Sequence, residues 1–282
     1  MELGLKGKTA IVGGASAGIG YAIARLLAGE GAQVAMVARR SEALAEAAAR
    51  ITGETGSRTQ VIAADIRKGL DCERIVDEAV AAFGGVEILI NNDGAPPLGL
   101  LADFDDAAWD KAVQQNLMSV VRLTRRAIPH MKRVGRGRIV NITALSAVQP
   151  IPRFGLSVAT WAGVIGYAKT LSLEVAADNI TVNTICPGRI ATGRLAKVFG
   201  ADAQGSAPAA TTPGMSAGSA AAASAESADA TLAADLAKQI PLGRIGTPDE
   251  IAGLVALLVS DYGGYITGST MHVDGGRRAS VL

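Results

Sequence analysis

The residues with the clearest chemical potential form a glycine-rich loop near the amino terminus. Gly14, Gly18 and Gly20 follow the apolar run Thr9–Gly13 and precede a stretch with helical periodicity. Glycines at this spacing allow a tight turn and a close approach of the backbone to a ligand, and the following helix offers unpaired N–H groups to phosphate. This strand–loop–helix setting predicts a pyrophosphate site of a dinucleotide. The loop also contains Ser16, Ala17 and Ile19.

The second apolar run, Gln33–Ala38, ends in two arginines, Arg39 and Arg40. A site for NAD(H) usually has an acidic residue at this strand end, where it binds the adenosine ribose hydroxyls. No carboxylate stands here, and an arginine suits a 2′-phosphate. The sequence therefore favours NADP(H) over NAD(H). A solvated surface charge is the alternative interpretation of Arg39.

Apolar runs of strand length alternate along the chain with longer helical stretches. This alternation predicts an α/β protein with a Rossmann-type, doubly wound parallel sheet in three αβα layers, forming a single domain. The seven predicted strands are Thr9–Gly13, Gln33–Ala38, Gln60–Ala64, Val86–Asn91, Gly137–Ile142, Ile180–Ile185 and Thr270–Val273. The predicted helices are Tyr21–Ala28, Ser41–Thr52, Asp71–Phe83, Asp106–Met131, Ser157–Asp178 and Pro248–Ser260.

Composition excludes several classes of protein. The 282 residues are 49% hydrophobic and 19% charged, which supports a sizeable core and excludes wholesale disorder. The net charge of +1 does not show the excess of basic residues that is typical of proteins that bind nucleic acid or an anionic membrane. No apolar run approaches a membrane span and no signal pattern opens the chain, so a cytoplasmic location is expected. Two cysteines and two histidines exclude a disulfide scaffold and leave little for a metal site.

The segment Ala201–Ala230 differs from the rest of the chain. It consists mainly of alanine, serine, glycine and threonine, and it contains no valine, isoleucine, leucine or aromatic residue. Such a segment cannot bury enough surface to pack as a core element. It is expected to be a flexible insertion or a lid over a bound substrate.

Several further motifs follow the glycine loop in a fixed order. They are Asp65-Ile66, Asn91-Asn92-Asp93-Gly94, Asn116, Pro187-Gly188 with Thr192, and Asp274-Gly275-Gly276. With the glycine loop, they make the chain resemble the short-chain dehydrogenase/reductase family, in particular its β-ketoacyl carrier-protein reductase-like members. The resemblance covers nearly the whole chain apart from Ala201–Ala230.

The resemblance implies a role for each cofactor-site motif. Asp65 would hold the adenine, with Ile66 beside it, and Asn92 would border the cofactor together with Gly94. Ile190 and Thr192 would face the nicotinamide carboxamide, next to Pro187 and Gly188. The family usually assembles through its two long helices, so a homo-oligomer, a tetramer or a dimer, is expected.

The catalytic positions of the family are changed in this chain. The family uses a tyrosine as proton donor, a lysine about four residues later on the same helical face, a serine about thirteen residues before the tyrosine, and an upstream asparagine. The flanking motifs align these positions with Ser157, Trp161, Ala144 and Asn116 respectively. Only Asn116 is retained, so the chain is similar to a subgroup that lacks the usual catalytic tetrad.

No other tyrosine can take the missing role. The four tyrosines are Tyr21, Tyr167, Tyr262 and Tyr265, and the residues four positions later are Arg25, Leu171, Ile266 and Ser269. No Tyr-x-x-x-Lys motif exists anywhere in the chain. A serine hydroxyl is a far weaker acid than a phenol with a pKa of about 10, and an indole cannot supply the positive charge of a lysine.

Substitute proton donors are few. Asp93 stands where the family commonly has alanine, next to the expected cofactor, and Ser157 stands at the tyrosine position. Thr143 and Ser146 could donate hydrogen bonds to a carbonyl, and Arg153 could stabilise an oxyanion or be a solvated loop charge.

Three functions are compatible with these residues. The first is an NADP(H)-dependent oxidoreductase on carbonyl or alcohol groups with a non-standard proton donor. The second is a catalytically inactive cofactor-binding protein or regulatory subunit. The third is a non-redox enzyme that reuses the cleft. The fold alone does not choose among them, because function depends on the site.

Overall fold

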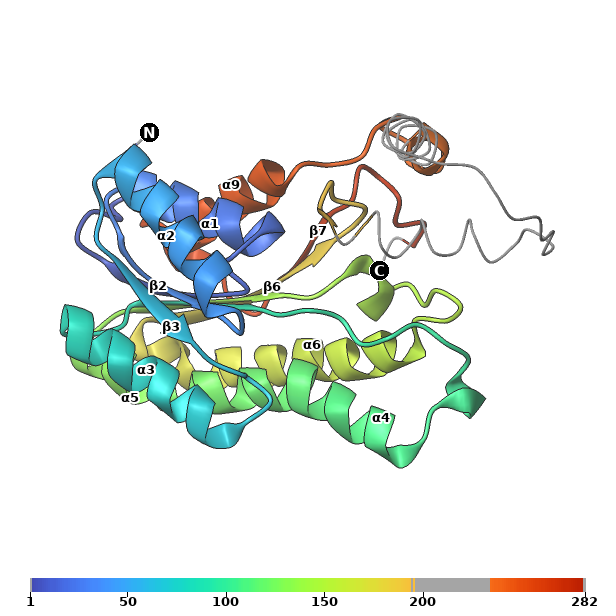
Figure 1. Cartoon of the computed structure of the whole chain (residues 1–282), viewed down its shortest axis with the longest axis horizontal. Helices are drawn as coiled ribbons and strands as arrows, with labels where there is room; N and C mark the ends of the chain where they lie inside the picture. The colour runs from blue at the N-terminus through green and yellow to red at the C-terminus, as the bar shows by residue number, and fades with distance from the viewer. Residues whose placement is uncertain (1, 194, 196–233, 281–282) are drawn as a thin grey trace, which may run out of the picture.

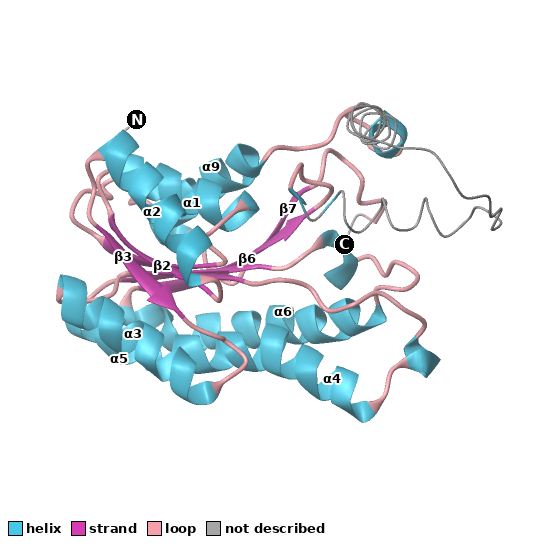
Figure 2. Cartoon of the chain, viewed as in Figure 1, coloured by secondary structure: helices cyan, strands magenta, loops and turns pink. Residues whose placement is uncertain are grey.

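The computed structural model describes residues 2–193, 195 and 234–280. Its centre is a parallel sheet of seven strands in the order β3-β2-β1-β4-β5-β6-β7. The strands are β1 (Thr9–Gly13), β2 (Gln33–Ala38), β3 (Thr59–Ala63), β4 (Ile88–Asn92), β5 (Gly137–Ile142), β6 (Ile180–Pro187) and β7 (Thr270–Val273). The predicted Rossmann-type parallel sheet is therefore confirmed (Figure 2).

Helices cover both faces of this sheet, as Figure 1 shows. One face carries α1 (Gly18–Gly29), α2 (Ser41–Thr55) and α9 (Pro248–Val259), and the other carries α3 (Gly69–Phe83), α4 (Asp106–Ala112), α5 (Ser119–Val134) and α6 (Gly155–Val175). Among the described helices, none is long and apolar enough to cross a membrane. The segment Ala201–Ala230, predicted to be an insertion or a lid, lies outside the described residues.

The core consists of two apolar layers, one on each side of the sheet. Side chains alternate along β1, so Ala10 and Val12 pack in the layer under α1, α2 and α9, while Ile11 packs in the layer under α3, α5 and α6. Residues buried on both faces explain the uninterrupted apolar runs of the sequence.

The predicted single helix Asp106–Met131 is wrong in one respect. A π-helical segment, Val113–Met118, separates α4 from α5, and Asn116 lies within it. A π-helical hydrogen bond spans five residues instead of the four of an α-helix, and such turns occur often at functional sites. The predicted helix Ser157–Asp178 also differs, since α6 begins at Gly155 and its last turn, Ala176–Asp178, is a 3₁₀ helix.

The order of the strands in the sheet indicates where a ligand would bind. β1 pairs with β2 on one side and with β4 on the other, so the direction of strand addition reverses at β1. In doubly wound sheets, ligands bind outside the carboxyl ends of the strands at this reversal point. The glycine loop and Arg39 follow strand ends there, and the Asn91–Gly94 motif spans the end of β4.

Candidate functional site

The glycine-rich loop between β1 and α1 forms one wall of the site. Gly14 and Gly18 have positive φ angles of 60° and 57°, a conformation that glycine adopts without strain. A Cβ on Gly20 would lie 2.3 Å from the carbonyl oxygen of Gly14, so a side chain cannot fit there. The N-cap residue of α1, Ala17, provides no side-chain cap. The first helical N–H groups therefore suit an anion such as a pyrophosphate.

A first cavity of about 410 Å³ lies beside this loop. It is lined by Gly14, Ser16, Val37, Ala38, Arg39, Arg40, Ala64, Asp65, Ile66, Arg67, Asn92, Asp93, Gly94 and Gln115. These residues come from the ends of four strands and from the π-helical segment. Sequence motifs far apart in the chain thus meet in one place.

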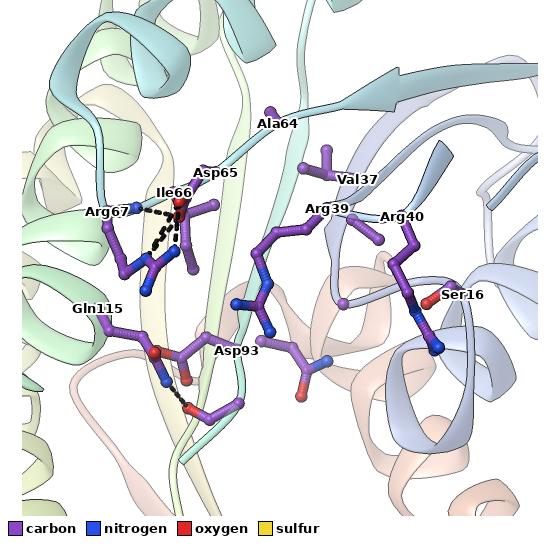
Figure 3. Close-up of a pocket in the computed structure, with 14 residues that line it drawn as sticks. Ser16, Val37, Arg39, Arg40, Ala64, Asp65, Ile66, Arg67, Asp93 and Gln115 are labelled. Atoms are coloured by element: carbon purple, nitrogen blue, oxygen red, sulfur yellow. Dashed lines mark hydrogen bonds and ion pairs between the residues drawn. The ribbon is translucent and has the colours of Figure 1, made fainter. Parts of the chain in front are cut away.

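Two arginines at the end of β2 dominate the charge of the first cavity. Figure 3 shows Arg39 extending toward the middle of the lining residues, and Arg40 next to Ser16. Both arginines are exposed to solvent, so an incoming anion can reach them without a displacement of the core. The arrangement fits a phosphate group on the adenosine ribose.

The one acidic side chain on the β3 side of this cavity is engaged by its neighbour. Arg67 donates to both carboxylate oxygens of Asp65, at 2.8 and 3.1 Å from Nε and at 2.6 Å from Nη2 (Figure 3). The hydrogen bonds from Arg67 hold the pKa of Asp65 below its usual value. Arg67 is not among the residues predicted for this site from the sequence, although its position two residues after Asp65 was the available signal.

A second cavity of about 230 Å³ continues the site toward β5 and β6. It is lined by Ile19, Asn92, Asp93, Ile142, Thr143, Ala144, Leu145, Ser146, Ile151, Phe154, Trp161, Pro187, Gly188, Arg189, Ile190, Thr192, Leu195 and Arg277. Most of these side chains are apolar, as is usual where a small ligand binds. The sequence analysis did not single out Arg277, which directly follows the Asp-Gly-Gly motif.

Asn92 and Asp93 line both cavities and therefore mark the junction between them. The side-chain amide of Asn92 donates to the carbonyl oxygen of Gly13 at 2.9 Å, which fixes the glycine loop against the end of β4. Asp93 is half-buried at this junction. A ligand that occupied both cavities would pass beside its carboxyl group.

The loop after β6 closes the second cavity from the other side. Ile190 is buried and pairs through its backbone with Gly246. A Cβ on Gly18 would lie 3.2 Å from the methyl group of Thr192, so this loop packs directly against the glycine loop. The two loops predicted to contact one cofactor therefore lie side by side.

The residue at the family's lysine position contributes to the cavity wall. Trp161 is only 6% exposed and packs with Val120, Val164 and Ala144. Its indole thus occupies a place beside the small side chain of Ala144, at the end of β5. An aromatic ring and a methyl group therefore line this part of the second cavity.

Two predicted catalytic residues are not among the residues that line the two cavities. Asn116 donates from its side-chain amide to Oγ1 of Thr160 at 2.9 Å, and this hydroxyl donates to the carbonyl oxygen of Leu156 at 2.7 Å. Ser157 is 1% exposed, and its hydroxyl has no hydrogen-bond partner among the described residues. Neither Asn116 nor Ser157 lines the first or the second cavity.

The remaining candidate donors are Thr143, Ser146 and Arg153, and they differ in their hydrogen bonds and in whether they line a cavity. Thr143 donates from Oγ1 to the carbonyl oxygen of Ile185 at 3.1 Å. Ser146 lines the second cavity, is 2% exposed, and has no hydrogen-bond partner for its hydroxyl among the described residues. A buried hydroxyl without a partner is costly, and a ligand carbonyl would satisfy it. Arg153 lines neither cavity.

The described residues do not favour thiol or metal chemistry at this site. Cys186 is buried, and this burial raises the pKa of its thiol above the usual value. Burial likewise raises the pKa of the Cys72 thiol to about 11. Within the described residues, no three histidine, cysteine or acidic side chains are grouped so that they could hold a metal ion.

Comparisons with known proteins agree with this geometry. A family model described as short chain dehydrogenase matches residues 8–202, and one described as enoyl-(acyl carrier protein) reductase matches residues 210–278. Nodulation protein G of Rhizobium sp. strain N33 is 37% identical over 272 residues, which cover 96% of this chain and 97% of the relative. A 3-oxoacyl-acyl-carrier-protein reductase of Staphylococcus epidermidis is 35% identical over 269 residues, covering 95% and 98%.

A solved structure shows the same similarity in three dimensions. L-Sorbose reductase from Gluconobacter frateurii, complexed with NADPH and L-sorbose, superposes with a TM-score of 0.89 at 31% sequence identity. The match covers 100% of this chain and 100% of that chain. The similarity therefore extends over the whole fold.

Proposed function

The chain belongs to the short-chain dehydrogenase/reductase family of oxidoreductases, and from this premise we propose that it is an NADP(H)-dependent oxidoreductase acting on carbonyl or alcohol groups through a non-standard proton donor. The observation that carries the proposal is the position of Asp93. It lines both cavities, whereas Asn116 and Ser157 line neither.

The preference for NADP(H) rests on the charges of the first cavity. Arg39 and Arg40 are exposed there, and the nearby carboxylate of Asp65 is occupied by Arg67. A free carboxylate at the end of β2 would favour the ribose hydroxyls of NAD(H), but no carboxylate stands there. The similar L-sorbose reductase was solved with NADPH, which supports the same choice.

The remaining cofactor contacts follow from the motifs. We place the pyrophosphate at the glycine loop, formed by Gly14, Ser16, Ala17, Gly18, Ile19 and Gly20. We place the adenine beside Asp65 and Ile66, and the nicotinamide in the second cavity next to Pro187, Gly188, Ile190 and Thr192. Asn92, which lines both cavities, and Gly94, which lines the first, would border the cofactor between these two ends. When bound, the nicotinamide supplies or accepts a hydride at the substrate carbon.

Two residues of the chain, Ser146 and Asp93, then act on the substrate oxygen. The Ser146 hydroxyl donates a hydrogen bond to the carbonyl oxygen, which polarises the bond toward hydride attack. The carboxyl group of Asp93 donates its proton to the alkoxide that forms, and is reprotonated from solvent. In the direction of alcohol oxidation, the Asp93 carboxylate accepts the hydroxyl proton. The apolar wall around Trp161 excludes water from the reacting carbon.

One observation favours a second candidate function, a cofactor-binding protein without redox turnover. Trp161 fills the wall where the family has its lysine, and Asn116 is bound to Thr160 instead of facing the cavity. A role of Ser157 as proton donor stays a prediction of the sequence. The homo-oligomeric state and the cytoplasmic location also stay predictions.

A titration with NADPH tests the cofactor part of the proposal. The chain has two tryptophans, Trp109 and Trp161, and of these only Trp161 lines the second cavity. We expect NADPH to quench the tryptophan emission in a saturable manner, because the reduced nicotinamide would lie near Trp161. The quenching should be lost in Trp161→Phe and kept in Trp109→Phe.

The outcomes of this titration separate the candidates. A wild-type protein without saturable quenching by NADPH, and without binding in calorimetry, contradicts the proposed cofactor. Tight binding of NADPH together with zero turnover over a broad panel of carbonyl compounds supports the second candidate instead.

A further inference from the structure

The wall of the second cavity opposite the glycine loop is apolar except at a few points. Leu145, Ile151, Phe154 and Trp161 supply most of this wall. Two arginines, Arg189 and Arg277, also line the cavity. A guanidinium among mostly apolar side chains favours a ligand with a negatively charged group at that point of the cavity.

The guanidinium of Arg189 is already used by the protein. Its Nη1 donates to the carbonyl oxygen of Leu236 at 2.9 Å, and its Nη2 donates to Oε1 of Gln239 at 2.8 Å. These bonds hold the segment before Ile240 against the loop after β6. Arg189 is therefore a structural residue of the cavity wall.

Arg277 differs from Arg189 in this respect. In the described part of the chain, no group accepts a hydrogen bond or an ion pair from its side chain. The carboxylate of Asp274 attracts it electrostatically. However, the two oxygens of Asp274 accept backbone N–H groups, from Gly276 at 2.9 Å and from Arg278 at 2.7 Å. Burial lowers the pKa of Arg277 from its usual value, which indicates a charge that has lost part of its hydration.

The turn after β7 holds Arg277 in this place. Gly275 and Gly276 have positive φ angles of 66° and 84°, and the carboxylate of Asp274 caps the turn as described above. A Cβ on Gly188 would lie 2.7 Å from the Cα atom of Asp274, so the turn packs directly against the loop after β6. The position of Arg277 at the cavity is therefore set by the backbone.

We propose that Arg277 binds a carboxylate group of the substrate, so that the oxidoreductase acts on oxo acids and the corresponding hydroxy acids. This inference rests on the proposed function, since it names the substrate class of the same site. A planar guanidinium binds a carboxylate through two parallel hydrogen bonds. The phosphates of the cofactor are assigned to the glycine loop and to Arg39, which leaves Arg277 for the substrate.

Titration calorimetry with the protein saturated with NADP⁺ tests this inference, because the oxidised cofactor cannot reduce the ligand. The probes are 4-oxopentanoate and 5-oxohexanoate, each compared with its neutral amide. We expect the acids to bind at least about tenfold more tightly than the amides, since charge-assisted bidentate pairs are stronger than neutral hydrogen bonds. Arg277→Gln should abolish this difference, and Arg277→Lys should retain part of it.

The neighbouring arginine provides a matched control. Arg278 does not line the second cavity, and its side chain contacts His272 and Ser280. Arg278→Gln should therefore keep the preference for acids. Equal affinity for acid and amide, binding of neither probe, or an unchanged preference in Arg277→Gln would each overturn the inference.

The affinity for NADPH separates this inference from the proposed function. If Arg277→Gln weakens NADPH binding in the tryptophan titration, the arginine serves the cofactor, and the inference fails while the proposed function stands. If the wild-type protein does not bind NADPH at all, the proposed function fails first.

Discussion

Replacement of Asp93 by asparagine is expected to lower the rate of carbonyl reduction by about a hundredfold to ten-thousandfold, the usual contribution of a positioned general acid. Asparagine has nearly the same size and shape, but its amide does not release a proton to an alkoxide. The affinity for NADPH should stay unchanged in the tryptophan titration. Single-turnover consumption of NADPH, followed by absorbance, measures the effect on the chemical step alone.

Ser157→Ala is the matched control for this variant. In the wild-type protein Ser157 is buried and lines neither cavity, so we expect little change in the rate of carbonyl reduction when its hydroxyl is removed. A large loss of rate in Ser157→Ala, with a near-normal rate in Asp93→Asn, would contradict the assignment of Asp93 as the proton donor and would assign this role to Ser157. A loss of folding in either variant is detected by circular dichroism and excluded from the comparison.

The double substitution Arg39→Ala and Arg40→Ala is expected to weaken NADPH binding by about a hundredfold or more. A hydrogen bond to a charged group contributes about 1.5–3 kcal/mol, and a loss of about 1.4 kcal/mol corresponds to about a tenfold weaker affinity. NADH lacks the 2′-phosphate, so its affinity should change little. Calorimetric titrations of both dinucleotides against the wild-type and variant proteins measure the difference.

Arg25 supplies a control for the loss of surface charge. It forms an exposed ion pair with Asp249 and lines neither cavity, so Arg25→Ala should leave the ratio of the two affinities unchanged. Tighter binding of NADH than of NADPH by the wild-type protein would contradict the assignment of Arg39 and Arg40 to the 2′-phosphate.

The parts of the site that depend on local backbone geometry could be predicted from the sequence. The glycine loop, the arginines at the end of β2 and the Asp-Gly-Gly turn each follow a strand, and the alternation of strands and helices fixes where strand ends meet. The backbone geometry of each motif is determined by a few neighbouring residues. The parallel seven-stranded sheet could be predicted because strand segments and helical segments alternate along the chain.

The parts that depend on long-range packing could not be predicted. The π-helical segment that contains Asn116 differs from an α-helix by one residue in the span of each hydrogen bond, which the apolar pattern does not reveal. The burial of Ser157 depends on how α6 packs against its neighbours, and the same packing determines that Ser157 lines neither the first nor the second cavity. Arg277 reaches the second cavity only because the turn after β7 packs against Gly188.

In the proposed reaction, hydride passes between NADPH and a substrate carbon. Incubation with NADPH that carries deuterium at both hydrogens of nicotinamide C4, over a panel of oxo acids and neutral ketones, follows this transfer directly. We expect an alcohol product with one deuterium on the carbinol carbon, as measured by mass spectrometry. Tight NADPH binding with no deuterium in any product would contradict it.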